Sequence, residues 1–256
     1  MSTPQPAAAP APHPRTTRTV LTVIALAVLL VFIVSAGSAA IQITGVGETT
    51  AHLILAACYA VAIALAGPIA WRMRFTPVQL GLARPRAADG LPVLWFLPLI
   101  VIEAVGLLPG ISSTGTPLVL SLILLTVLVG IGEELYFRGL IVPLLNRINV
   151  TVAVWVSAAI FAVGHLPNAL QFSGLYVALQ FVFAFVFGLV TALLVVRTGS
   201  LWVLIAWHAC HDFIGYATGN TISGLAGTAA IIQVLLMAVY AAVLLRGTVT
   251  RHPQTV

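Results

Sequence analysis

Charged side chains are scarce in this sequence, and lysine is missing altogether. Only 7% of the 256 residues are charged, whereas about a quarter are charged in a typical soluble domain. Eleven arginines and six carboxylates give a net charge of +5, and 61% of the residues are hydrophobic. No water-soluble packing hides that much apolar surface, so the solvent must be a lipid bilayer. Soluble enzymes, nucleic-acid-binding proteins and disordered chains are therefore excluded.

Several familiar chemistries lack the residues that they need. The two cysteines, Cys58 and Cys210, lie far apart in apolar stretches, which argues against a disulfide or a cysteine-ligated metal. No G-x-S-x-G or similar serine nucleophile motif is present. The only aspartates are Asp89, in a connection between apolar runs, and Asp212. A nucleophilic-serine protease and a transmembrane aspartate pair are therefore excluded.

Long apolar runs dominate the chain, and about twenty apolar residues cross a bilayer as a helix. Eight runs predict an all-α, polytopic bundle, at about 19–36, 51–71, 91–108, 117–145, 151–167, 175–196, 200–218 and 222–245. Residues 1–18 and 247–256 are expected to be cytoplasmic tails, the first of them disordered, around one transmembrane bundle at 19–246. Cleavage of the first run as a secretory signal, after Ser38-Ala39-Ala40, is the less favoured alternative.

The arginines predict how the bundle is oriented, because positive residues concentrate in cytoplasmic loops. Every second connection carries arginine and the four others carry none, which places both termini in the cytoplasm of a multi-pass cell-membrane protein. Ten arginines follow this alternation: Arg15, Arg18, Arg72, Arg74, Arg84, Arg86, Arg147, Arg197, Arg246 and Arg251. The eleventh, Arg138, lies inside the fourth run and needs another explanation.

Ionisable residues at membrane depth mark a candidate site, since each costs about 2.5–3.5 kcal/mol to place there. At about 1.5 Å per residue, Glu133 and His165 lie roughly 21 Å from the cytoplasmic ends of their runs. His208 and Asp212 lie roughly 13 and 19 Å from theirs. Three predicted helices, which cross the membrane in opposite directions, thus place polar residues at a similar depth in the bilayer. This predicts that the residues form a single site.

Helical geometry separates the roles of these residues. Glu134 and Arg138 stand four apart and can pair, which leaves Glu133, about 100° away, free to face a cavity. His208 and Asp212 also share one face, where Asp212 could fix the tautomer of the imidazole.

Two more ionisable residues lie inside apolar runs. Glu103 could touch the cavity, because intramembrane acids seldom face lipid. His211 could also line it, although a hydrogen bond between helices explains this residue as well. Both are possible rather than favoured members of the site.

A family resemblance rests on three motifs. They are Glu133-Glu134-x-x-x-Arg138, Phe161-x-x-x-His165 and His208-x-x-x-Asp212. Together they resemble the CPBP family of CAAX proteases and bacteriocin-processing enzymes, also called Abi, which includes the Ras-converting CAAX endopeptidase of eukaryotes. Each motif is weak alone, but three in order and at matching depth are specific. The resemblance covers about residues 90–218 and leaves the outer runs unmatched.

The resemblance implies an intramembrane endopeptidase of eight helices. Glu133 and His165 would activate the attacking water, and His208 with the residue at position 212 would stabilise the oxyanion. Relatives often carry asparagine where this chain has Asp212. An ionised carboxylate accepts hydrogen bonds but cannot donate one to an oxyanion, so Asp212 is expected to serve His208 instead.

The resemblance leaves the metal content open. Relatives are commonly classed as metalloproteases, and Glu133, His165 and His208 could furnish three ligands of a zinc site with water as the fourth. No H-E-x-x-H motif is present, and water activation by glutamate without a metal is the favoured interpretation. Glu134 and Arg138 are implied to support the site.

Three functions compete. The favoured one is hydrolysis of a membrane-associated peptide, either CAAX-like and prenylated or of bacteriocin type. A proton-coupled transporter is the first alternative, because buried Glu/His chains relay protons, although no internal repeat or pair of broken helices supports it. A non-catalytic immunity or scaffold protein is the second, and the presence of the matched catalytic positions argues against it.

Overall fold

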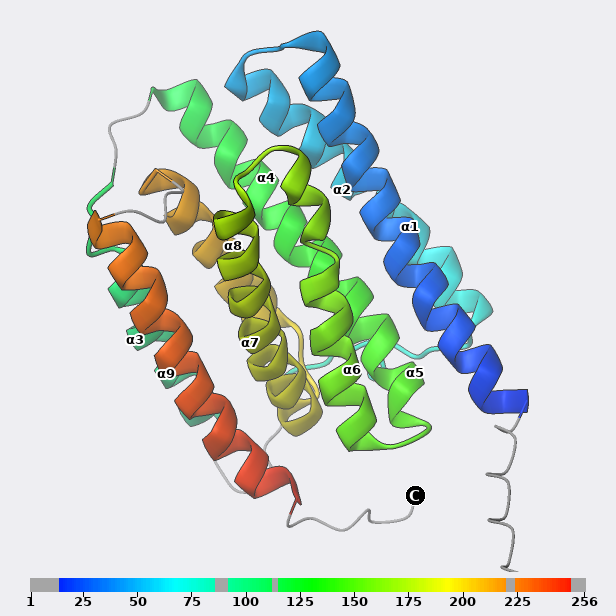
Figure 1. Ribbon diagram of the computed structural model, residues 1–256. Helices are drawn as coiled ribbons and strands as arrows, with labels where there is room; N and C mark the ends of the chain where they lie inside the picture. The colour runs from blue at the N-terminus through cyan, green and yellow to red at the C-terminus, as the bar shows by residue number, and fades with distance from the viewer. Residues whose placement is uncertain (1–13, 86–91, 112–114, 220–223, 250–256) are drawn as a thin grey trace, which may run out of the picture.

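The computed structural model describes residues 14–85, 92–111, 115–219 and 224–249, which form a bundle of helices with no named β-strand among them (Figure 1). In chain order the helices are α1 (Pro14–Thr44), α2 (Glu48–Arg72), α3 (Leu97–Gly106), α4 (Thr116–Glu134), α5 (Val142–Asn146), α6 (Val150–Val163), α7 (Gly174–Thr198), α8 (Trp202–Ala217) and α9 (Gly224–Val249). Short 3₁₀ turns cover Pro92–Trp95 and Leu166–Leu170, and a π-helical segment covers Leu135–Ile141. The all-α prediction is confirmed.

Six helices of the described chain are long and apolar enough to cross a membrane. They are Thr16–Thr44, Glu48–Arg72, Thr116–Asn146, Val150–Leu170, Gly174–Thr198 and Gly224–Arg246. α8 has 16 residues and α3 has ten, so the count of eight crossings stays a prediction. α3 is short because Pro92 precedes it and Pro109 follows it, and each removes a backbone donor from the third apolar run, whereas Pro98 lies in the first turn of α3, where no donor is needed.

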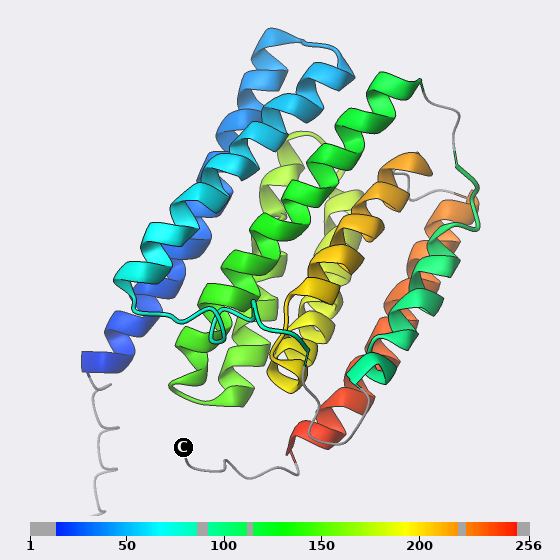
Figure 2. The same ribbon diagram turned by 180° about the vertical axis from the view of Figure 1, so that it is seen from behind.

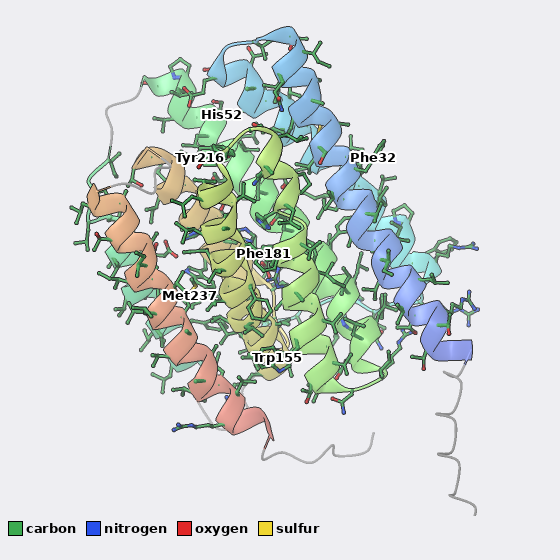
Figure 3. The ribbon with its side chains drawn as sticks, in the orientation of Figure 1. Phe32, His52, Trp155, Phe181, Tyr216 and Met237 are labelled. Atoms are coloured by element: carbon green, nitrogen blue, oxygen red, sulfur yellow. The ribbon has the colours of Figure 1, made fainter. Side chains whose placement is uncertain are left out.

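The outer surface of the bundle is apolar. Phe32 on α1 is 70% exposed and points outward in Figure 3, and Ile43 on the same helix is 85% exposed. Trp71 near the end of α2 is 82% exposed. A contiguous apolar surface of this kind marks contact with lipid. The protein is therefore a multi-pass membrane protein.

The helices form a bundle with two outer pairs. α1 packs on α2 at one side, α3 packs on α9 at the other, and α4 and α8 contact each other between them (Figures 1 and 2). The start of α1 and the end of α9 lie at the same end of the bundle, as an even number of crossings requires (Figure 1). α1 begins at Pro14, inside the segment expected to be a tail, and residues 1–13 and 250–256 lie outside the described part of the chain. The cytoplasmic location of the termini stays a prediction.

Glycines allow the central helices to approach closely. A Cβ at Gly130 of α4 would lie 2.8 Å from the carbonyl oxygen of Ile205 in α8. A Cβ at Gly188 of α7 would lie 3.0 Å from the Cα of Ala158 in α6. Small residues bring membrane helices together because van der Waals packing, rather than the hydrophobic effect, drives their association. The contact at Gly130 sets α4 and α8 side by side, where their polar residues meet.

An extended connection fixes the start of α8. The segment after α2 crosses one end of the bundle (Figure 2), where Leu82 forms an isolated antiparallel bridge with Ser200. The amide of Leu201 donates to the carbonyl of Gly81 at 2.7 Å, and Nε1 of Trp202 donates to the carbonyl of Leu82 at 3.0 Å. The depth of α8, and with it that of His208, is thereby tied to α2.

Candidate active site

The first site segment is the end of α4, where the backbone changes from α- to π-helical after Glu134. The amide of Val142 donates to the carbonyl of Phe137, five residues back. Pro143 has no amide to donate, so the helix cannot return smoothly to α-helical bonding at that position. Segments of π-helix are rare and are frequently found at functional sites. The uniform 100° turn assumed for this run therefore holds only as far as Glu134.

Glu134 is fully buried and contacts side chains of two helical segments. Its Oε1 lies 3.2 Å from Nη1 of Arg138, so the predicted pairing is present. The same oxygen accepts a hydrogen bond from Nδ1 of His208 on α8 at 3.0 Å. Glu134, rather than Asp212, therefore sets the tautomer of His208, which differs from the expectation. The reason is that α4 and α8 pack closely enough for Glu134 to reach across.

Arg138 is buried against an aromatic face as well as beside an acid. Its side chain is 1% exposed, and its guanidinium carbon lies 4.3 Å from the ring centre of Phe161. Its contact with Glu134 is close but lacks hydrogen-bond geometry, and its nitrogens have no hydrogen-bond partner among the described residues. The ion pair and the cation–π contact together offset the burial of this charge. This explains the one arginine that the topology rule did not place.

Three site residues face one cavity of about 540 Å³, to which every helix except α5 contributes lining residues. Nε2 of His208 lies 3.7 Å from Oε2 of Glu133 and 3.7 Å from Oδ2 of Asp212. The side chain of Glu133 is 13% exposed, and that of Asp212 is 24% exposed. The free edge of the His208 ring is therefore placed between two carboxylates at the cavity wall.

His165 lines the same cavity from the end of α6. α6 ends at Val163 because Pro167 cannot donate to that carbonyl, and His165 sits in the following turn. Its Nδ1 donates to the carbonyl of Phe161 at 2.9 Å, since a carbonyl can only accept. The Phe161 ring contacts both imidazoles, with its centre 4.9 Å from His165 and 6.0 Å from His208.

Glu103 does not line the cavity, whereas His211 does. Oε1 of Glu103 accepts hydrogen bonds from Nε1 of Trp207 at 2.6 Å and from Nδ1 of His211 at 3.2 Å. The His211 ring stacks on Phe183 of α7, with centres 4.7 Å apart. This second buried acid thus joins α3 to α8 from behind the cavity wall.

The candidate metal ligands do not gather. Among the described residues, no three His, Cys, Asp or Glu side chains form a group that could hold a metal ion. Glu133 lies near His208, but His165 does not join them in such a group within the described part of the chain. The ligand set considered from the sequence therefore does not fit a zinc site in this arrangement.

Sequence reasoning missed three aromatic residues at or beside the site. Tyr59 of α2 donates to Oε1 of Glu133 at 2.6 Å, and Trp207 holds Glu103. Tyr216, one turn after Asp212, lines the cavity and meets the edge of the His52 ring, whose centre is 6.1 Å away (Figure 3). The available signal was a hydroxyl or indole donor inside an apolar helix, since such donors need a partner when buried.

A comparison of the chain with curated proteins found no match. The family model of Rce1-like type II CAAX prenyl endopeptidases matches residues 115–214, which run from the start of α4 to near the end of α8. That segment holds all three motifs and lies within the range of about 90–218 inferred from them. Over these helices the chain is similar to the Rce1-like type II CAAX prenyl endopeptidases, and the family resemblance predicted from its motifs is confirmed.

Proposed function

We propose that this protein is an intramembrane endopeptidase that hydrolyses a peptide bond of a membrane-associated substrate with activated water. The carrying observation is that Glu133 and Asp212 flank the free nitrogen of His208 at the wall of a cavity that His165 also lines. The match to the CAAX endopeptidase family supports the same reaction. Buried charges are costly in a membrane, so a cluster of this size calls for a chemical role.

Glu133 and His165 supply the proton acceptors. Oε2 of Glu133 accepts no hydrogen bond from the described residues, and it faces His208 across 3.7 Å. The Nδ1–H of His165 donates a hydrogen bond to the Phe161 carbonyl, so in the neutral ring Nε2 carries the lone pair. A water held by these two acceptors would lose a proton as it attacks the scissile carbonyl.

His208 serves the opposite purpose. Its Nδ1–H is committed to Glu134, and in the imidazolium form its Nε2–H is also a donor, suited to the developing oxyanion. Three carboxylates within 4 Å of the ring balance that positive charge. Asp212 acts here on His208, as an acceptor and a negative charge, rather than as a donor to the oxyanion.

The cavity lining suits an apolar ligand next to a polar reaction centre. Leu30 and Val34 of α1, Leu125 and Val129 of α4 and Val234 of α9 belong to it. A CAAX-like peptide, whose prenyl group would occupy the apolar part, is the substrate class that we favour. A bacteriocin-type precursor is the other outcome of the test.

The deciding experiment compares membrane peptides of cells that carry wild type or Glu133→Gln. Glu48→Gln is the matched control, because Glu48 is exposed at the start of α2, away from the site. We expect one precursor to accumulate uncleaved with Glu133→Gln only, while both variants fold. Cleavage at the wild-type rate by Glu133→Gln would overturn the proposal. Proton-driven solute uptake into liposomes that contain the wild-type protein, without any peptidase activity, would also overturn it.

A further inference from the structure

Tyr59 reaches the reaction centre from a helix outside the family match. It belongs to α2, lines the cavity and is 6% exposed. Its hydroxyl donates to Oε1 of Glu133 at 2.6 Å, across 74 residues of sequence. Charge-assisted hydrogen bonds of this length are about twice as strong as neutral ones. This contact is therefore a substantial constraint on the Glu133 side chain.

The backbone of α4 is shaped to receive the Tyr59 ring. Gly132 directly precedes Glu133, and a Cβ at Gly132 would lie 2.8 Å from Cδ1 of Tyr59. That distance is shorter than real contacts permit, so any larger residue at position 132 would displace the ring. Gly132 therefore leaves the space in which the Tyr59 ring must lie for its hydroxyl to reach Glu133.

The hydrogen bond makes the two oxygens of Glu133 unequal. Oε1 is held by Tyr59, whereas Oε2 accepts no hydrogen bond from the described residues and lies 3.7 Å from Nε2 of His208. Without the hydroxyl, the terminal torsion of a glutamate is broad, so the plane of the carboxylate could rotate away from His208. With it, the buried Oε2 is held beside Nε2 of His208.

We infer that Tyr59 is a positioning residue, which holds the Glu133 carboxylate beside His208 in the orientation that removes a proton from water. The inference rests on the proposed endopeptidase activity and adds to it a residue that the matched segment does not contain. Small misplacements of a catalytic group, of about 1 Å, lower rates by about 100-fold. The effect should fall on the chemical step and leave substrate binding nearly unchanged.

The test uses the full-length protein in lipid nanodiscs and a quenched fluorescent peptide with a farnesylated CAAX end. For Tyr59→Phe we expect kcat to fall about 10- to 100-fold, with KM within about twofold of wild type. Tyr136→Phe is the matched control, because Tyr136 is also buried but its hydroxyl donates to the carbonyl of Ala62 at 3.0 Å. Gly132→Ala should lower kcat as well, and the double variant Tyr59→Phe/Gly132→Ala should be no slower than the slower single one.

The outcomes separate this inference from the proposal on which it rests. A wild-type protein that cleaves no peptide defeats the endopeptidase proposal itself. A cleaving wild type with an equal kcat for Tyr59→Phe overturns the positioning role alone. A raised KM at unchanged kcat also overturns it, since Tyr59 would then bind substrate, as would equal losses in Tyr59→Phe and Tyr136→Phe that follow their thermal stability.

Discussion

Glu134 and His208, on different helices, are joined by a hydrogen bond of 3.0 Å between Oε1 and Nδ1. The same carboxylate oxygen lies 3.2 Å from the Arg138 guanidinium. One fully buried acid thus neutralises the arginine on its own helix and orients an imidazole on the neighbouring helix. Support of the fold and orientation of the site depend on the same atom.

The first prediction concerns the charge of Glu134. Glu134→Gln keeps the shape of the side chain but leaves Arg138 buried without its counter-ion, which costs about 3–5 kcal/mol for buried pairs. The double variant Glu134→Gln/Arg138→Met should recover part of that stability, because neither charge then remains. Thermal unfolding in nanodiscs measures both. Equal stability of Glu134→Gln and wild type would contradict the account of Arg138.

The second prediction concerns position 212, where a negative charge beside His208 and a hydrogen-bond donor to the oxyanion would affect kcat differently. Asp212→Asn loses the negative charge beside His208 but gains an amide that can donate to an oxyanion. Asp212→Ala loses the charge and gains no donor. We expect kcat about 3- to 10-fold below wild type for the asparagine variant and about 100-fold below for the alanine variant, since the loss of the charge weakens His208 as an oxyanion donor, and one such donor contributes about 100-fold or more.

Peptide cleavage by the two variants under identical conditions is the measurement, with circular dichroism to show that both fold. If asparagine is as poor as alanine, the carboxylate charge of Asp212 is the essential feature. If asparagine exceeds wild type, Asp212 has no positive role at His208.

The sequence predicts how deep each site residue lies in its helix, but not which residues of neighbouring helices it contacts. Depth depends on position along the chain, so matching depths correctly brought Glu133, His208 and Asp212 to one cavity. Contacts between helices depend on their rotation and packing, which depth does not contain. For that reason the hydrogen bonds from Tyr59 to Glu133 and from His208 to Glu134 could not be predicted.

The periodicity of apolar residues also could not predict local departures from regular helix. Prolines shorten α3 and end α6, so a predicted crossing at 91–108 is a ten-residue helix and His165 lies in a turn. The π-helical segment after Glu134 preserves the Glu134–Arg138 contact although the spacing of the backbone bonds changes. Apolar composition decides that a segment is in the membrane, but backbone donors decide where each helix stops.

The third prediction separates a structural acid from a catalytic one. The side chain of Glu103 is about as little exposed as that of Glu133, but it contacts Trp207 and His211 and does not line the cavity. Glu103→Gln leaves one oxygen for the Trp207 indole and replaces the other with an amide that meets Nδ1 of His211. We expect a loss of about 1–3 kcal/mol in stability, the usual cost of a mispaired buried polar group, with cleavage within about threefold of wild type.

Glu133→Gln should give the reverse pattern, because the amide can still accept from Tyr59 while it can no longer take a proton from water. Thermal unfolding and peptide cleavage of both variants in nanodiscs therefore form a crossed comparison: stability falls in one and activity in the other. Loss of cleavage in Glu103→Gln at unchanged stability would instead show that Glu103 acts in the reaction through His211. Of the two residues that donate hydrogen bonds to Glu103, His211 lines the cavity and Trp207 does not.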